Sequence, residues 1–371
     1  MREGILTERE WLRQVWRVSK RRPPCWGAQY VTPPPQPKLH QRRKYRQWLV
    51  LSLALGVMGL AWYIISRCQI PPSDFPIMPA LSQTVERPQK STVRINSAVS
   101  YSYPQLPVKE VTFPREELLR GNIMLLNREY PLPHDVPGAN TVSIATFGKG
   151  IVPVHNLDLK SGRQTIDALY QFFLFARQKG IEGLGISRGT LSEVEQRELQ
   201  LERVKVYAAS MSLQEAVEKA RQEVDDPRTS DYQQQYTVEI RLYTPWEGAA
   251  DQRPLALTEQ GRFLLTNAWR YGFIRRFPNE NNNPYKAYQF RYVGVAHSTA
   301  MTYLDLELEA YLELLHEKQV IFIHDKGTPK YLILCLPVTD GYASFPVPEN
   351  ASYEAGYDNM GYAVVACTFA S

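Results

Sequence analysis

Cysteine and histidine, which build most disulfide and metal sites, are scarce in this chain. Its 371 residues include four cysteines and six histidines. So few cysteines in so long a chain exclude a disulfide-stapled fold, and none of them has the C-x-x-C spacing of a zinc site. The motifs S-x-x-K, H-E-x-x-H and G-x-x-x-x-G-K-[ST] are also missing. Their absence argues against penicillin-binding, thermolysin-like and P-loop proteins.

Excess positive charge is confined to the N-terminus. Residues 1–47 hold twelve Lys and Arg residues against three Asp and Glu residues, whereas the whole chain holds 43 against 38. An uncharged apolar run follows at residues 48–65. At 1.5 Å per residue this run spans about 27 Å, close to the thickness of a bilayer core. Because basic flanks favour the cytoplasmic side of a membrane, the tail is explained without a nucleic-acid partner.

These features predict a topology. We expect a basic cytoplasmic tail over residues 1–47, a transmembrane helix over 48–66, and a single-pass protein of the cell membrane whose C-terminal domain is extracellular. Residues 67–117 are rich in proline among serine, threonine and glutamine, a composition typical of a spacer. We therefore expect a Pro/Ser-rich extracellular linker there.

Hydrophobic periodicity beyond the linker indicates an α+β fold. Residues 236–243 alternate, with Val238, Ile240 and Leu242 on one face and Glu239 on the other, as in a half-buried strand. Further strands are expected at 122–126 and 289–293, and helices at 167–177, 191–207, 257–271 and 304–316.

The last part of the chain changes character. From residue 319 onward, short apolar runs alternate with Gly, Pro and Asn, which predicts a C-terminal β subdomain over residues 319–371. Cys335 and Cys367 lie on two of these runs. A disulfide between neighbouring strands and two buried free thiols are both compatible with this placement.

Four segments occur in an order typical of one enzyme family: Asn122–Pro133, Ile186–Gln196, Trp269–Pro278 and Phe290–Gly294. They resemble the LLVN…LP, SGYRS…Q, YGFI.RYP and HFRYVG segments of the VanY-type D-alanyl-D-alanine carboxypeptidases. These are zinc enzymes that trim the terminal D-Ala from peptidoglycan stem peptides. The resemblance implies a VanY/hedgehog-like zinc-peptidase domain over residues 118–318, with a small antiparallel sheet and flanking helices. The C-terminal subdomain resembles the extension of clostridial membrane-anchored members.

The resemblance also locates the family's catalytic site. It places Tyr232 and Gln289 where the family has zinc-binding histidines, Glu239 where it has the aspartate ligand, and Lys286 where it has the general-base glutamate. Leu191 stands where the family has the arginine that receives the substrate carboxylate. Of the metal-site positions only Glu239 keeps a good zinc ligand. The remaining cleft is implied to include Leu191, Ser192, Gln196 and Ser230.

A carboxylate left without its metal in a partly buried cleft needs another cation nearby. We therefore expect Lys286, or a neighbouring basic side chain, to pair with Glu239. The alternative is that Lys286 points into solvent and Glu239 is hydrated.

Together these observations predict a membrane-anchored domain that has lost its zinc ligands. We expect a non-catalytic peptidoglycan- or protein-binding module of the cell envelope, without metal or other cofactor. Its expected partners are the membrane and a stem peptide or envelope protein, not nucleic acid.

Two enzymatic alternatives stay open. One is an active D-alanyl-D-alanine carboxypeptidase with zinc at an unusual site, for example one built from Glu239, His155 and His297. The other is a serine esterase, because Gly185–Gly189 matches G-x-S-x-G.

Overall fold

The computed structural model describes residues 97–242, 254–279, 283 and 285–370. It corrects the predicted cell-membrane localisation, because no helix in these described ranges is long and apolar enough to cross a bilayer. The apolar run at 48–66 and the basic tail at 1–47, on which that prediction rested, lie outside the described residues.

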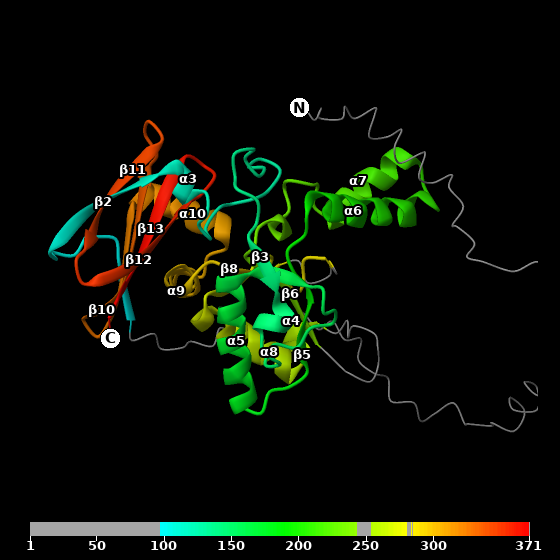
Figure 1. Ribbon diagram of the computed structural model, residues 1–371, viewed down its shortest axis with the longest axis horizontal. Helices are drawn as coiled ribbons and strands as arrows, with labels where there is room; N and C mark the ends of the chain where they lie inside the picture. Colours follow the sequence, from blue (N-terminus) through cyan, green and yellow to red (C-terminus); the bar gives the residue numbers. More distant parts are fainter. Residues whose placement is uncertain (1–96, 243–253, 280–282, 284, 371) are drawn as a thin grey trace, which may run out of the picture. The chain divides into compact units, whose positions relative to one another are not determined.

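A four-stranded antiparallel sheet is central to the predicted peptidase domain (Figure 1). Its strands follow the order β5 (Leu184–Arg188), β6 (Thr237–Leu242), β8 (Gln289–Tyr292) and β7 (Phe273–Arg275). Val238, Ile240 and Leu242 of β6 share one core with Phe172 of helix α5 (Arg163–Gln178). The alternation predicted for this strand is confirmed, since these three side chains join the core while Glu239 is bonded by Ser187 and Arg188.

Helices surround this sheet, and short elements connect them. The predicted helices correspond to α5, α6 (Glu193–Ala208), α8 (Glu259–Asn267) with the 3-10 turn η3 (Ala268–Tyr271), and α10 (Leu308–Lys318). Helices α7 (Leu213–Glu223) and α9 (Val295–Leu304) were not predicted. The remaining elements are α3 (Arg115–Leu118), α4 (Ile144–Phe147), β3 (Thr141–Ser143), β4 (Lys160–Gly162), η1 (Asp231–Gln233) and η2 (Leu255–Leu257).

Helices α6 and α7 form a hairpin that extends from the sheet (Figure 1). Each helix begins with a capping box, formed by Ser192 with Glu195 in α6 and by Ser212 with Glu215 in α7. In each box the serine side chain accepts a backbone N–H and the glutamate accepts another, so the first turn is satisfied locally. This arrangement explains why the start of α6 was readable from sequence.

The C-terminal part folds as a β subdomain with two sheets. The larger sheet has the order β1 (Ser97–Ser100), β9 (Val320–Asp325), β10 (Thr328–Pro337), β13 (Tyr362–Phe369) and β12 (Ala351–Tyr357). The smaller one pairs β2 (Val108–Pro114) with β11 (Tyr342–Pro348). Strands β1 and β2 fall within the linker predicted over 67–117, so the structure differs from that prediction at its C-terminal end.

The two cysteines of the β subdomain are free and buried. Cys335 on β10 lies opposite Val364 of β13, whereas Cys367 on β13 lies opposite Leu332. The two thiols therefore occupy non-adjacent register positions, and they belong to separate hydrophobic clusters. The disulfide alternative does not hold, and the free-thiol alternative is confirmed.

Residues 122–126 are buried but do not form the predicted strand. Their carbonyls instead face a side chain: Arg291 Nη2 donates to the carbonyls of Asn122 (3.1 Å) and Met124 (2.6 Å). A guanidinium thus satisfies backbone acceptors that a neighbouring strand would otherwise satisfy.

Arg291 also belongs to a buried ion network. Asp231 accepts hydrogen bonds from Arg291 Nη1 and from Arg276 Nε, the latter at 2.7 Å. Arg276 makes a second, bidentate contact with Glu309 at 2.9 and 2.6 Å. Arg276 and Arg291 lie in two of the segments that resemble the VanY family, so part of that resemblance reflects the interior of the fold rather than the catalytic site.

His297 is buried in the core beneath the larger sheet, and its titration tests this burial. Its Nδ1 lies 2.7 Å from the Tyr311 hydroxyl, and burial lowers its pKa from 6.5 to about 3. Below pH 6.5 His297 is protonated in the unfolded chain but stays neutral in the folded chain. The free energy of unfolding therefore falls as the pH falls from 6.5 toward 3. We expect this group to cost about 2 kcal/mol of unfolding free energy between pH 7 and pH 5.

The measurement is urea unfolding at both pH values for the wild type and for His297→Gln, which can still bond Tyr311 but does not titrate. The variant should lose about 2 kcal/mol less than the wild type over this interval. Equal losses in the two proteins would contradict the assignment.

Candidate functional site

The structure brings together three of the four residues placed at the family's catalytic site. Glu239 of β6 and Gln289 of β8 are directly opposite in register, so their side chains lie on the same face of the sheet. The Tyr232 hydroxyl donates to Glu239 Oε2 at 3.5 Å. All three side chains are buried, and Glu239 is only 3% exposed. We call Tyr232, Glu239 and Gln289 the former metal centre.

Glu239 is held by cationic and hydroxyl groups on both of its oxygens. Ser187 donates to Oε1 at 2.6 Å, and Arg188 Nη1 donates to Oε2 at 2.9 Å. Arg241 Nε also donates to Oε1. The register of β5 against β6 shifts between Ile186 and Arg188, and such an irregularity redirects side chains. It explains how the consecutive residues Ser187 and Arg188 both reach one carboxylate.

The predicted pairing of Glu239 with a basic side chain is confirmed, but the prediction of Lys286 is wrong. Lys286 Nζ lies 3.5 Å from Asp225 Oδ1 instead. Lys286 ends a turn in which its N–H donates to the Asn283 carbonyl. This turn places its ammonium beside Asp225, at the end of the α6–α7 hairpin, while the arginines of β5 and β6 reach Glu239.

The charges at the former metal centre are fixed by these contacts. Burial by itself would raise the pKa of Glu239, but Arg188 and Arg241 outweigh burial and lower it. Burial raises the pKa of Tyr232, so its phenol keeps its proton at neutral pH. The centre therefore holds one carboxylate, two guanidiniums, a neutral phenol and a carboxamide.

This set does not fit zinc. Structural and catalytic zinc sites use thiolate, imidazole and carboxylate ligands, and Glu239 is the only such group at the former metal centre. Its oxygens already accept from two guanidiniums, whose charge would repel Zn²⁺. Within the part of the chain that the structure describes, no group of three or more His, Cys, Asp and Glu residues is placed to hold a metal.

The alternative sites proposed from sequence are not assembled either. His297 is buried against Tyr311 beneath the β subdomain, which separates it from the cluster around Glu239. Ser187 lies on an antiparallel strand and donates to Glu239, unlike a serine nucleophile on a strand-to-helix turn. A hydrolase triad would also need an acidic residue between this serine and His297, and Asp251, which has that place in the sequence, lies outside the described residues.

The space at the former metal centre is small. Gln289, Tyr232, Lys286 and Arg188 line a cavity of about 10 Å³, which is roughly the size needed for one water molecule. Two of the predicted cleft residues, Gln196 and Ser230, lie here. Gln196 donates to the Asp225 carbonyl at 2.7 Å, while its Oε1 and the Gln289 Nε2 have no partner in the described residues.

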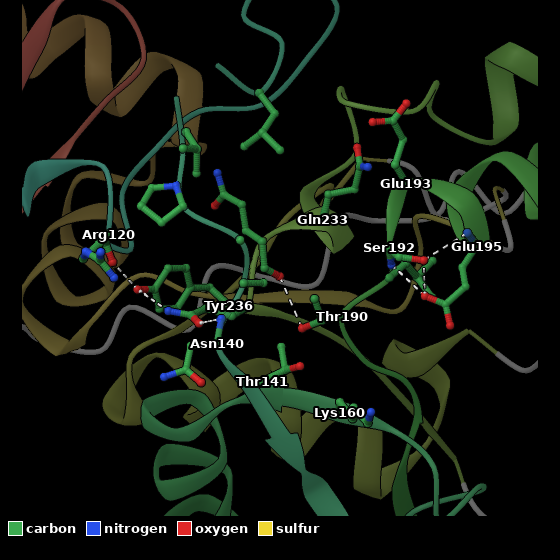
Figure 2. A pocket seen from close by; sticks show the side chains of 18 of the residues that line it. Arg120, Asn140, Thr141, Lys160, Thr190, Ser192, Glu193, Glu195, Gln233 and Tyr236 are labelled. Carbon is green, nitrogen blue, oxygen red and sulfur yellow. Dashed lines mark hydrogen bonds between the residues drawn. The ribbon is translucent and has the colours of Figure 1, made fainter. Parts of the chain in front are cut away.

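The other two predicted cleft residues line a much larger groove (Figure 2). Leu191 and Ser192 contribute to a space of about 900 Å³, which we call the groove. Leu191 donates its N–H to the Tyr232 carbonyl at 2.7 Å. The segment at 190–192 therefore lines the groove and is bonded to Tyr232, which lines the small cavity.

Arg188 and Arg241 are the site residues that sequence reasoning missed. Arg241 could have been found, because the alternation of β6 places it on the same face as Glu239. Arg188 could not, because its contact depends on how β5 pairs with β6 across about fifty intervening residues.

Comparisons with known proteins agree with this fold. No protein-family model matches the chain. It is 24% identical over 263 residues to a D-alanyl-D-alanine carboxypeptidase of Enterococcus faecium, covering 69% of this chain and 78% of that protein. A second D-alanyl-D-alanine carboxypeptidase, from Enterococcus faecalis strain ATCC 700802 / V583, is 24% identical over 283 residues, covering 73% and 91%.

Among solved structures, the vancomycin resistance D,D-dipeptidase VanXYg in complex with a D-Ala-D-Ala phosphinate analogue has a TM-score of 0.57. It shares 20% identity, with 70% of this chain and 99% of that chain covered. Its similarity supports the α+β zinc-peptidase fold described above. The two sequence relatives and the shared fold confirm the resemblance of this chain to the VanY-type D-alanyl-D-alanine carboxypeptidase family.

Proposed function

We propose that this chain is a non-catalytic member of its family that binds peptidoglycan stem peptides. One observation carries the proposal: the carboxylate that corresponds to a zinc ligand, Glu239, is bonded by Arg188 and Arg241. Because a guanidinium cannot activate a water molecule as a metal does, this arrangement supports loss of the peptidase reaction. The similar dipeptidase structure holds a D-Ala-D-Ala analogue, which supports a peptide of this class as the ligand.

An active carboxypeptidase is the second candidate. Glu239 keeps a carboxylate at the ligand position, and both sequence relatives are named as carboxypeptidases. His155 lies close enough to sense Glu239 and Arg241 electrostatically, although burial is the main cause of its lowered pKa. An imidazole near this carboxylate is the feature that favours the candidate.

The two candidates differ in metal content and product. The purified chain, incubated with excess Zn²⁺ and then dialysed, should retain far less than one zinc per chain by mass spectrometry. It should release no D-Ala from a synthetic stem pentapeptide, yet bind that peptide in calorimetry. The reason is that Glu239 offers zinc no free oxygen.

Glu239→Ala is the control for this experiment. Stoichiometric zinc together with D-Ala release, both lost in that variant, would establish the carboxypeptidase instead. A chain that neither binds nor cleaves the pentapeptide would contradict both candidates.

A further inference from the structure

The groove and the former metal centre differ greatly in the size of the ligand that they can hold. The groove encloses about 900 Å³, whereas the former metal centre leaves about 10 Å³. Sites for small molecules and short peptides occupy about 300–1,000 Å³, so only the groove has room for a peptide. Resting on the proposed function, we infer that the stem peptide binds in the groove, beside the former metal centre rather than in it.

The walls of the groove are held in place by hydrogen bonds. On one side the Gln235 side chain accepts from the Asn140 N–H at 2.9 Å, and its carbonyl accepts from the Gly162 N–H at 2.8 Å. Leu132, which also lines the groove, donates its N–H to the Arg228 carbonyl at 2.7 Å. These bonds tie residues 132–140 and Gly162 to the chain at 228–235 that precedes β6, so a ligand need not order the groove when it binds.

Polar side chains along the groove suit a peptide backbone. The Asn140 amide and the Thr141 hydroxyl make no hydrogen bond to any other residue that the structure describes, and both lie at the rim in Figure 2. The Thr190 hydroxyl makes a long contact of 3.5 Å to the Gln234 carbonyl, while its backbone N–H donates to the Lys160 carbonyl at 2.8 Å. An amide and two hydroxyls offer the donors and acceptors that peptide groups require.

The apolar parts of the groove are aliphatic. Leu132, Val136 and Leu191 provide surface for small methyl side chains such as those of alanine. Among the described residues that line the groove, Tyr236 is the only aromatic one; it is 6% exposed, and its hydroxyl donates to the Arg120 carbonyl. Without an open ring face for a sugar to stack on, the lining favours the peptide over the glycan part of peptidoglycan.

Lys160 provides a positive charge that favours peptides carrying a carboxylate. It is exposed at the groove, whereas Glu195 on the facing side is occupied by the hydroxyl and N–H of Ser192. These bonds lower the pKa of Glu195, so Glu195 stays ionised and remains bonded to Ser192 at the start of α6. Lys160 is therefore placed to receive a ligand carboxylate, which stem peptides carry.

The test is calorimetric titration of the full chain with a synthetic stem pentapeptide ending in D-Ala-D-Ala. Lys160→Glu reverses the charge at this position of the groove, and Asn140→Trp fills part of the groove. Both positions are exposed, so the variants should fold, which thermal melting can check. Each should weaken binding at least about tenfold, equivalent to about 1.4 kcal/mol.

Two further variants serve as controls. Lys205→Glu makes the same charge change on an exposed face of α6 outside the groove, and Lys286→Gln alters the wall of the small cavity that Tyr232 and Gln289 also line. Both should bind the pentapeptide within about twofold of the wild type, since neither touches the groove.

The outcomes separate this inference from the proposed function. Weakening by Lys286→Gln, with no effect of Lys160→Glu or Asn140→Trp, would place the peptide at the former metal centre. That result would overturn the inference and leave the proposed function standing. Failure of the wild-type chain to bind the pentapeptide would instead overturn the proposed function, and the inference with it.

Discussion

Replacing Asp231 by alanine should lower the free energy of unfolding by about 3–5 kcal/mol. Asp231 is 1% exposed and pairs with Arg276 and Arg291, which are equally buried. Removing one partner of a buried ion pair leaves an uncompensated charge, which is more costly than the pair itself was worth. Arg276 keeps Glu309, so Arg291, left with neutral acceptors, accounts for most of the loss.

Urea unfolding followed by circular dichroism measures this effect. The matched control is Asp167→Ala, which removes an exposed pair with Arg163 within α5. Exposed helical pairs contribute about 0.3–0.5 kcal/mol, so the two aspartates should differ by several-fold. A loss below about 1 kcal/mol for Asp231→Ala would show that water or a rearranged side chain replaces the carboxylate.

Elements with a local signal were predictable from sequence. The alternation of Val238, Ile240 and Leu242 reports the face of β6 directly, because side chains in a strand point to opposite faces in turn. The Ser192 capping box marks the start of α6 in the same local way.

Elements defined by distant partners were not predictable. Strand β1 exists because Ser97 pairs with Asp325, more than two hundred residues away. The surrounding proline-rich composition predicted a linker, and only tertiary pairing overrides that local preference. Residues 122–126 show the opposite case: an apolar run that is buried but bonded by Arg291 rather than by a strand.

The candidate site, like the fold, was predictable from sequence only in part. Residue types at the positions that match the family's site predicted a centre without most of the zinc ligands, and charge balance predicted a cation beside Glu239. Which cation reaches it depends on the Asn283–Lys286 turn and on the β5 irregularity. Neither leaves a clear mark in the sequence, so lysine was predicted where arginine is found.

The contacts of Glu239 determine which substitutions would be needed to rebuild a zinc site. Four substitutions, Tyr232→His, Gln289→His, Glu239→Asp and Lys286→Glu, restore the family's residue types. Arg188 would remain, however, and its Nη1 now lies 2.9 Å from the carboxylate that zinc must approach. Zinc binds carboxylate oxygens at about 2.0–2.2 Å, so the guanidinium and the metal would compete for one position.

Adding Arg188→Ala to the four substitutions should therefore strengthen zinc binding at least about tenfold. Two like charges about 4 Å apart repel by several kcal/mol at the effective dielectric of a protein, which allows a larger gain. Competition with a chromophoric chelator measures the affinity of the two variants. The control adds Arg197→Ala to the four substitutions instead, because Arg197 pairs with Glu193 on α6 outside the centre.

That control should bind zinc as weakly as the four-substitution variant. Equal zinc affinity with and without Arg188 would mean that its guanidinium moves aside when the ligands return. Arg188 would then not be a barrier to zinc, and the residue types at positions 232, 239, 286 and 289 alone would set the zinc affinity of this centre.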